Sequence, residues 1–148
     1  MGLAVFSDEY FIGEALKEAQ KAFEADEVPV GAVVVCNDRI IARAHNLAER
    51  LTDVTAHAEM QAITAAANFL GGKYLSGCTL YVTLEPCLMC AGALNWAQVD
   101  KVVYGASDPK KGFSKFHKNP FHPKTNVQSG IRAAECAALL TDFFSKKR

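Results

Sequence analysis

Two short motifs with metal-binding side chains constrain this chain more than any other feature of its sequence. The first contains His57 and Glu59, and the second is a C-x-x-C segment formed by Cys87 and Cys90. One imidazole and two thiolates can hold a tetrahedral zinc ion and leave its fourth position open for water. A fold that uses this chemistry has to bring two distant parts of the chain to one point.

Local patterns predict that each motif lies at the start of a helix. Thr55 is a good N-cap residue for a helix that runs to about Phe69. Pro86 fits the first position of a helix that runs to about Gln98. The N-terminal end of a helix carries partial positive charge, which favours the thiolate form that binds metal. Two converging helix starts would supply three ligands and a positively biased pocket.

The remainder of the chain alternates between helical and strand patterns. We expect further helices over 8–25 and from Ser129 onward, strands over 31–36, 40–45, 79–82 and 101–105, and a long irregular segment over 106–128. The strand over 31–36 is wholly apolar, which is typical of a strand buried on both faces. A hairpin followed by alternating strands and helices predicts an α/β fold in which helices cover a mixed sheet.

Composition sets modest bounds. A chain of 148 residues that is half apolar suits one globular domain, residues 1–148, with a real core. Its formal net charge is zero, so the whole chain shows no bias toward nucleic acid. The five cysteines suggest no disulfide framework, and neither a secretory signal nor a membrane-spanning stretch is evident. We therefore expect a cytoplasmic protein with no membrane partner.

The charges are unevenly distributed. Residues 1–30 carry seven acidic side chains against two lysines, whereas residues 101–124 carry six lysines against one acid. Within the second segment Phe113, Phe116 and Phe121 alternate with lysines. Basic and aromatic side chains together are typical of surfaces that bind single-stranded RNA, although a solvated loop is the default interpretation of such lysines.

Glu59 lies two residues beyond the histidine, a spacing that lets a carboxylate lie beside a metal without binding it. Such a group could take a proton from an activated water and pass it to a bound substrate. The backbone N–H of Ala58 is a candidate anchor for a polar atom of a base. The alternative is a structural zinc site closed by a fourth ligand, for which His45 is the nearest candidate in the sequence. That alternative leaves Glu59 without a purpose.

The two motifs together match the H-x-E…P-C-x-x-C pattern of zinc-dependent nucleobase deaminases. Over nearly its whole length the chain resembles the cytidine deaminase-like zinc deaminases, and within them the bacterial tRNA-specific adenosine deaminases. The similar segments are 28–33, 55–59, 80–87, 89–93, 102–106 and 135–140.

This resemblance implies a three-layer α/β/α fold with a mixed, mostly five-stranded central sheet. It implies one zinc ion per chain on His57, Cys87 and Cys90, with Glu59 as the proton shuttle. It further implies a homodimer that acts on the anticodon loop of tRNA and converts the wobble adenosine to inosine.

The resemblance also assigns substrate contacts. Asn46 matches an asparagine that binds the base and the sugar, Val30 matches an apolar wall of the pocket, and Asp108 matches a polar contact to the substrate backbone. By themselves, Asn46 and Asp108 are equally typical of turns.

Two segments differ from better-known members of the family. Residues 95–98 read Asn-Trp-Ala-Gln where many members have His or Gln followed by Ser-Arg, and residues 110–128 are rich in Lys, Phe, His and Pro. Both lie where substrate or a partner chain is expected. Three functions therefore stay open: a tRNA adenosine deaminase, a deaminase of a free base or nucleotide such as guanine or deoxycytidylate, and a non-catalytic zinc-held subunit that binds RNA.

Overall fold

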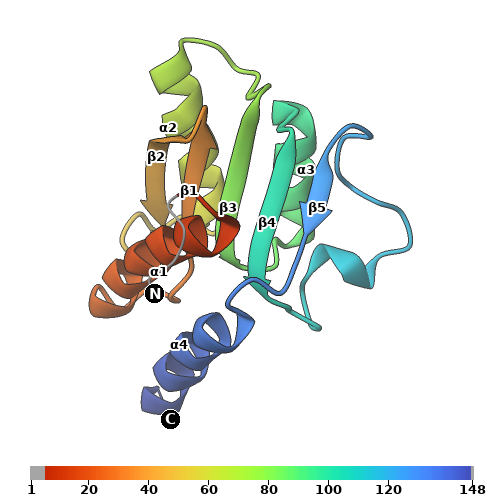
Figure 1. Cartoon of the computed structure of the whole chain (residues 1–148). Coiled ribbons are helices and arrows are strands. Elements are labelled where there is room, and N and C mark those ends of the chain that lie inside the picture. Colours follow the sequence, from red (N-terminus) through yellow and green to blue (C-terminus); the bar gives the residue numbers. More distant parts are fainter. Residues whose placement is uncertain (1–5, 148) are drawn as a thin grey trace.

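A five-stranded sheet forms the centre of the computed structural model, which describes residues 6–147 (Figure 1). The elements are α1 (Asp8–Glu24), β1 (Gly31–Cys36), β2 (Arg39–His45), α2 (Ala58–Leu70), β3 (Cys78–Leu84), α3 (Leu88–Ala97), β4 (Lys101–Ala106), a 3-10 helix (Phe113–Lys115), β5 (Asn126–Gln128) and α4 (Ala133–Lys146). The strand order is β2-β1-β3-β4-β5. β1 is antiparallel to both of its neighbours, whereas β3, β4 and β5 are parallel. The predicted mixed α/β sheet is confirmed.

Helices cover both faces of the sheet and produce two apolar cores. On one face α1 packs on the sheet and α4 packs beside β4, and Phe11 and Ile12 of α1 lie in the same core as Val33. On the other face, Ala62 of α2 lies in the same core as Val34. Successive residues of β1 thus face opposite cores, which explains why this strand is apolar throughout.

Three predicted helix starts lie too early in the chain. Thr55 does not cap α2, because its hydroxyl and its backbone N–H both bond to Asp53 in a preceding turn; His57 is the N-cap residue. Pro86 precedes α3, whose N-cap is Cys87. Ser129 does not cap the last helix, because the chain turns first through Arg132, whose φ is 53°.

The fifth strand was missed by the local patterns. β5 lies inside the segment expected to be irregular, has only three residues and pairs with the first half of β4. A strand this short shows no recognisable period of apolar residues, and its pairing depends on a partner distant in the sequence. Among the described residues, no helix is both long and apolar enough to cross a bilayer.

Candidate metal centre and substrate pocket

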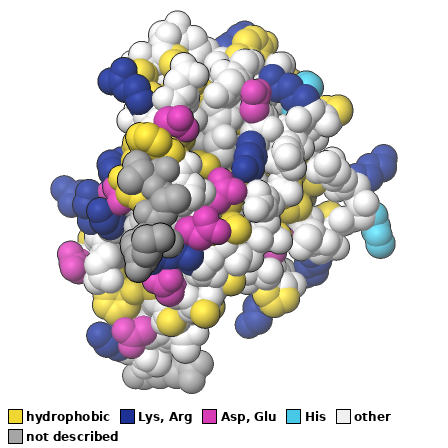
Figure 2. All heavy atoms as spheres, in the orientation of Figure 1, with side chains coloured by type: hydrophobic (Ala, Val, Ile, Leu, Met, Phe, Trp, Pro, Cys, Tyr) yellow, Lys and Arg dark blue, Asp and Glu magenta, His cyan; other side chains and the backbone are white. Residues whose placement is uncertain are grey.

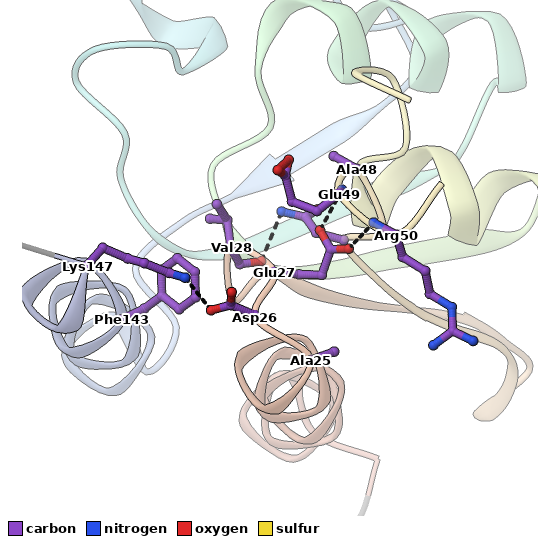
Figure 3. A pocket seen from close by; sticks show the side chains of 10 residues that line it. Ala25, Asp26, Glu27, Val28, Ala48, Glu49, Arg50, Phe143 and Lys147 are labelled. Atoms are coloured by element: carbon purple, nitrogen blue, oxygen red, sulfur yellow. Dashed lines mark hydrogen bonds and ion pairs between the residues drawn. The ribbon is translucent and has the colours of Figure 1, made fainter. Parts of the chain in front are cut away.

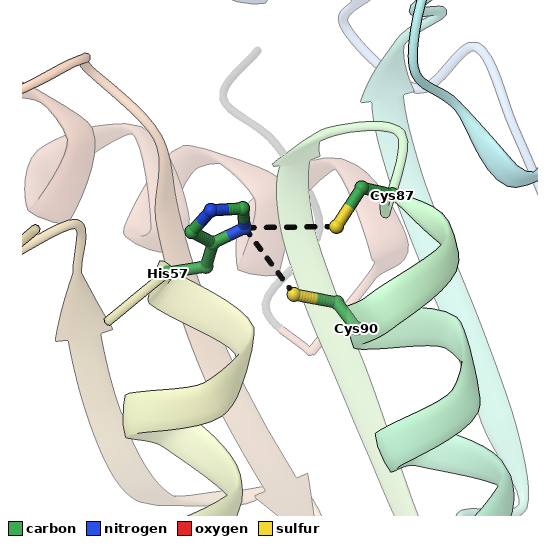
Figure 4. Close-up of side chains that lie close together, drawn as sticks. All are labelled: His57, Cys87 and Cys90. Carbon is green, nitrogen blue, oxygen red and sulfur yellow. Dashed lines mark hydrogen bonds between the residues drawn. The ribbon is translucent and has the colours of Figure 1, made fainter. Parts of the chain in front are cut away.

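The three predicted metal ligands meet at the starts of α2 and α3 (Figure 4). His57 is the N-cap residue of α2, Cys87 is that of α3, and Cys90 follows in the first turn of α3. Nδ1 of His57 lies 3.6 Å from Sγ of Cys87 and 3.5 Å from Sγ of Cys90. The fold therefore brings together two motifs that are remote in the chain.

These distances fit a tetrahedral zinc ion. With Zn–N near 2.0 Å and Zn–S near 2.3 Å, tetrahedral geometry places a nitrogen and a sulfur ligand about 3.5 Å apart. Among residues 6–147 no fourth His, Cys, Asp or Glu joins the group. His45, the candidate for a closed structural site, instead lies with its Nδ1 3.0 Å from the carbonyl oxygen of Asn46. The donor set is that of a zinc site with an open position.

The electrostatics of the cluster favour a bound cation. The pKa of Cys87 is lowered to about 4, chiefly by a hydrogen bond from the thiol of Cys90 and further by His57. The Cys87 thiolate and burial raise the pKa of Cys90, and the hydrogen bond with Cys87 raises that of His57. Negative charge therefore lies on the sulfur atom of Cys87, beside an imidazole nitrogen, and a divalent zinc ion would neutralise it.

Glu59 lies in the first turn of α2 and is 4% exposed. Burial is the main cause that raises its pKa, to about 7, and the nearby Cys87 thiolate acts in the same direction. A carboxyl group with a pKa near neutrality can both take and give a proton at physiological pH.

A cavity of about 210 Å³ opens beside the metal-binding cluster. It is lined by Val28, Val30, Asn46, Ala48, His57, Glu59, Leu84, Glu85, Cys87, Asp108 and Lys111. All the predicted site residues line it except Ala58 and Cys90, which are fully buried. The cavity is small enough to enclose a base beside the donor cluster.

Asn46 connects three parts of the pocket. Its Oδ1 accepts a hydrogen bond of 2.7 Å from the N–H of Ala58, and its Nδ2 donates to the carbonyl of Val28 at 3.1 Å. The Ala58 N–H, a candidate anchor for a base, is therefore already occupied, and a base would have to share or displace this bond. Asn46 fixes the start of α2 against the pocket wall.

Asp108 lines the pocket and also forms a turn. Its Oδ1 accepts backbone N–H groups from Lys110 and Lys111, each at 3.1 Å. Both interpretations of this residue from the sequence, turn former and pocket residue, therefore describe its position.

Several pocket residues were not predicted. Glu85 belongs to a segment that resembles the family, and Lys111 to the lysine-rich segment, so each had a signal that was given no pocket role. Val28, Ala48 and Leu84 are apolar residues with no chemical signal of their own. Their place in the wall depends on how the chain enters β1 and leaves β2 and β3. Walls built from apolar loop residues are visible only in the fold.

A larger cavity of about 580 Å³ adjoins the first and shares Val28, Asn46 and Ala48 with it (Figure 3). Phe143 and Lys147 of the C-terminal region line its other side, and Lys147 pairs with Asp26.

The lysine-rich segment presents fewer aromatic rings than its sequence indicates. Phe121 is 3% exposed, and Phe113 packs edge-on against it and against Tyr104. Of the three phenylalanines, Phe116 is the one that is largely exposed and free to stack on a base. Figure 2 shows acidic side chains gathered over α1, with Lys and His side chains projecting at the edge formed by the lysine-rich segment.

An open His-Cys-Cys cluster with a buried carboxyl group beside it is the site of a zinc-dependent nucleobase deaminase. A family model described as the cytidine and deoxycytidylate deaminase zinc-binding region matches residues 6–106. The chain belongs to this family, and it is a hydrolytic nucleobase deaminase.

Known proteins of this family are similar over most of the chain. The tRNA-specific adenosine deaminase of Bacillus subtilis is 50% identical over 95% of this chain and 91% of its own length. That of Agrobacterium fabrum is 46% identical over 94% and 95%. A solved structure from work on A-to-I editing at the wobble position of transfer RNA has a TM-score of 0.83 and 45% identity over 88% of this chain and 99% of its own.

Proposed function

We propose that the chain, as one deaminase domain over residues 1–148, converts adenosine to inosine at the wobble position of tRNA. Similarity over nearly the full length to tRNA-specific adenosine deaminases supports this substrate. The observation that carries the chemistry is the open three-donor cluster with buried Glu59 beside it.

His57, Cys87 and Cys90 would hold one zinc ion per chain through Nδ1 and two sulfur atoms. When bound, the ion supplies hydroxide by lowering the pKa of a water ligand to about 7. Thiolate ligands need a reducing environment, in keeping with the cytoplasmic location that we propose.

Glu59 carries the protons of the reaction. Its carboxylate accepts the proton that water loses and donates it to N1 of adenine, which makes C6 electrophilic. Once the oxygen of that water has bonded to C6, the carboxylate takes the remaining proton from the new C6 hydroxyl and donates it to the amino group. The C6–N bond then breaks, ammonia leaves and C6 becomes the carbonyl carbon of inosine. Burial keeps bulk water away from this carboxyl group, so it can move each of the two protons directly between the water oxygen and the base.

The walls of the pocket orient the base. Val30 supplies an apolar surface. The Asn46 amide also lines the cavity and can bind the base and the sugar once its hydrogen bond from the Ala58 N–H is displaced or shared. Asp108 also lines the cavity, and its carboxylate oxygens can accept a hydrogen bond from a hydroxyl of the ribose or of a neighbouring nucleotide.

The charge of the lysine-rich segment supports the proposal that the substrate is a polyanion. Lys110, Lys111, Lys115 and Lys118 are exposed, and Lys111 lines the pocket. Phosphate groups of an anticodon loop would neutralise such side chains, whereas a free base offers no phosphate.

A second copy of the chain would cover an apolar stripe on α3. Leu88, Met89 and Trp96 are exposed there by 44%, 38% and 83%. Met89 and Trp96 are two helical turns apart and share one face. Exposed apolar surface of this kind marks an interface, and we propose a homodimer.

The alternative substrate is guanine. A guanine deaminase from Bacillus subtilis is 40% identical, but its structure covers only 68% of this chain with a TM-score of 0.66. The test incubates purified protein separately with tRNA, guanine and deoxycytidylate and measures ammonia and inosine. We expect inosine in tRNA and negligible release of ammonia from guanine. Robust turnover of guanine with no inosine in tRNA would overturn the proposal that tRNA is the substrate.

A further inference from the structure

One buried carboxylate of the pocket, Glu85, takes no part in the steps described above. It is 3% exposed and lies between β3 and α3. Its Oε1 accepts the N–H of Asp108 at 2.9 Å, and its Oε2 accepts the N–H of Ser114 at 2.9 Å and the Ser114 hydroxyl at 2.6 Å. All three donors belong to residues 108–114, the wall that carries Asp108 and Lys111 into the cavity.

The same wall is joined to the backbone that leads into the metal-binding helix. Gly112 forms a β-bridge with Cys87, and the N–H of Phe113 donates to the carbonyl of Pro86 at 2.9 Å. A Cβ atom at Gly112 would overlap Oε2 of Glu85, so the wall lies directly on this carboxylate. The distance between the wall and the donor cluster is therefore set by these contacts.

A similar device holds a wall of the larger adjoining cavity, which Glu27, Glu49 and Arg50 line. Buried Glu27 accepts the N–H of Glu49 at 3.0 Å and the N–H of Arg50 at 2.8 Å (Figure 3). That wall has a second connection, since the Asn46 amide binds it to the start of α2. Among the contacts described for residues 108–114, Glu85 provides the side-chain connection to the metal-binding region.

We propose that Glu85 is a positioning residue for substrate binding, which holds residues 108–114 at the place where Asp108 and Lys111 meet the RNA. The proposal depends on the function proposed above. A carboxylate offers only acceptors to the three donors, whereas an amide would turn an NH₂ group toward one of them. A loosened wall weakens binding while the metal ligands and Glu59 stay in place, so KM rises and kcat does not fall.

The test measures KM and kcat on an anticodon stem-loop RNA together with zinc content. Glu85→Gln should raise KM at least tenfold, with kcat within threefold of the parent and unchanged zinc. Gly112→Ala keeps the carboxylate but intrudes on it, and it should give the same split. Ser114→Ala removes one of the three bonds and should raise KM by a smaller factor. Glu135→Gln, a change in an exposed carboxylate paired with Arg132, is the matched control and should leave both constants unchanged.

A second measurement needs no substrate. Trypsin should cleave Glu85→Gln and Gly112→Ala faster than the parent after the exposed lysines of the wall. If the parent makes no inosine, the proposal that tRNA is the substrate fails. In that case, unchanged rates of trypsin cleavage in both variants would separately overturn the role of Glu85. With an active parent, KM within twofold in both variants, or a loss of kcat alone, would overturn it. If Glu85→Gln does not fold, Gly112→Ala and Ser114→Ala decide by the same criteria.

Discussion

The metal-binding corner and the wall formed by residues 108–114 meet at one pocket but are built in different ways. The corner uses side chains at the starts of two regular helices, each anchored in an apolar core. The wall is a loop without long regular structure, and it is held by one buried carboxylate, a few backbone contacts and the packing of Phe113 against Phe121 and Tyr104. This difference indicates a division of labour, in which the corner performs the chemistry and the wall selects what is bound.

Removal of a ligand should give the largest effect. Cys87→Ala should lose the zinc ion and with it essentially all turnover on any substrate, and its melting temperature should fall, because metal ligation is coupled to folding. Metal analysis and thermal unfolding of the purified variant test this. Full retention of zinc would show that the corner is not the metal site.

Removal of the proton shuttle should give the second-largest loss of turnover. Glu59→Ala should keep zinc and fold yet lose turnover by about 10⁴-fold or more, since general acid–base groups contribute about 10²–10⁴-fold and this residue serves two transfers. Single-turnover rates with zinc-loaded protein measure the effect. Turnover within threefold of the parent would show that Glu59 does not carry the protons of the reaction.

Changes in the basic segment should be smaller and should act on binding. A combined Lys110→Ala, Lys111→Ala and Lys115→Ala variant should bind tRNA more weakly. Its slope of log affinity against log salt should be shallower by about 2, from about 0.7 for each phosphate on a single strand. Affinity measured over a range of salt concentrations gives the slope. Lys17→Ala with Lys21→Ala, two lysines of α1 that pair with buried acids, is the control and should leave the slope unchanged.

A substitution on the exposed surface of α3 should have the smallest effect on catalysis, because it lies outside the pocket. Trp96→Lys places a charge on the exposed apolar stripe and should shift the protein from dimer to monomer without loss of zinc. Light scattering coupled to size exclusion reports the mass. A parent that is already monomeric at micromolar concentration would contradict the homodimer.

The same division explains what could be predicted from the sequence. The metal-binding and proton-carrying side chains could be predicted, because they form two short motifs with distinctive spacing: His57 with Glu59, and Cys87 with Cys90. The apolar pattern of 31–36 likewise identifies a strand that is covered on both faces. The position of Val28 and the burial of Phe121 depend on tertiary packing, which leaves no local period. The hydrogen bonds between Glu85 and Ser114 join residues that are distant in the sequence, so no rule based on residue spacing could predict them.

The most direct test of this division is a single-turnover measurement at saturating anticodon stem-loop RNA. We expect the triple lysine variant, once saturated, to form inosine at a rate within threefold of the parent, while zinc-loaded Glu59→Ala stays slower by about 10⁴-fold. A triple lysine variant with intact zinc whose saturated rate falls as far as that of Glu59→Ala would contradict it.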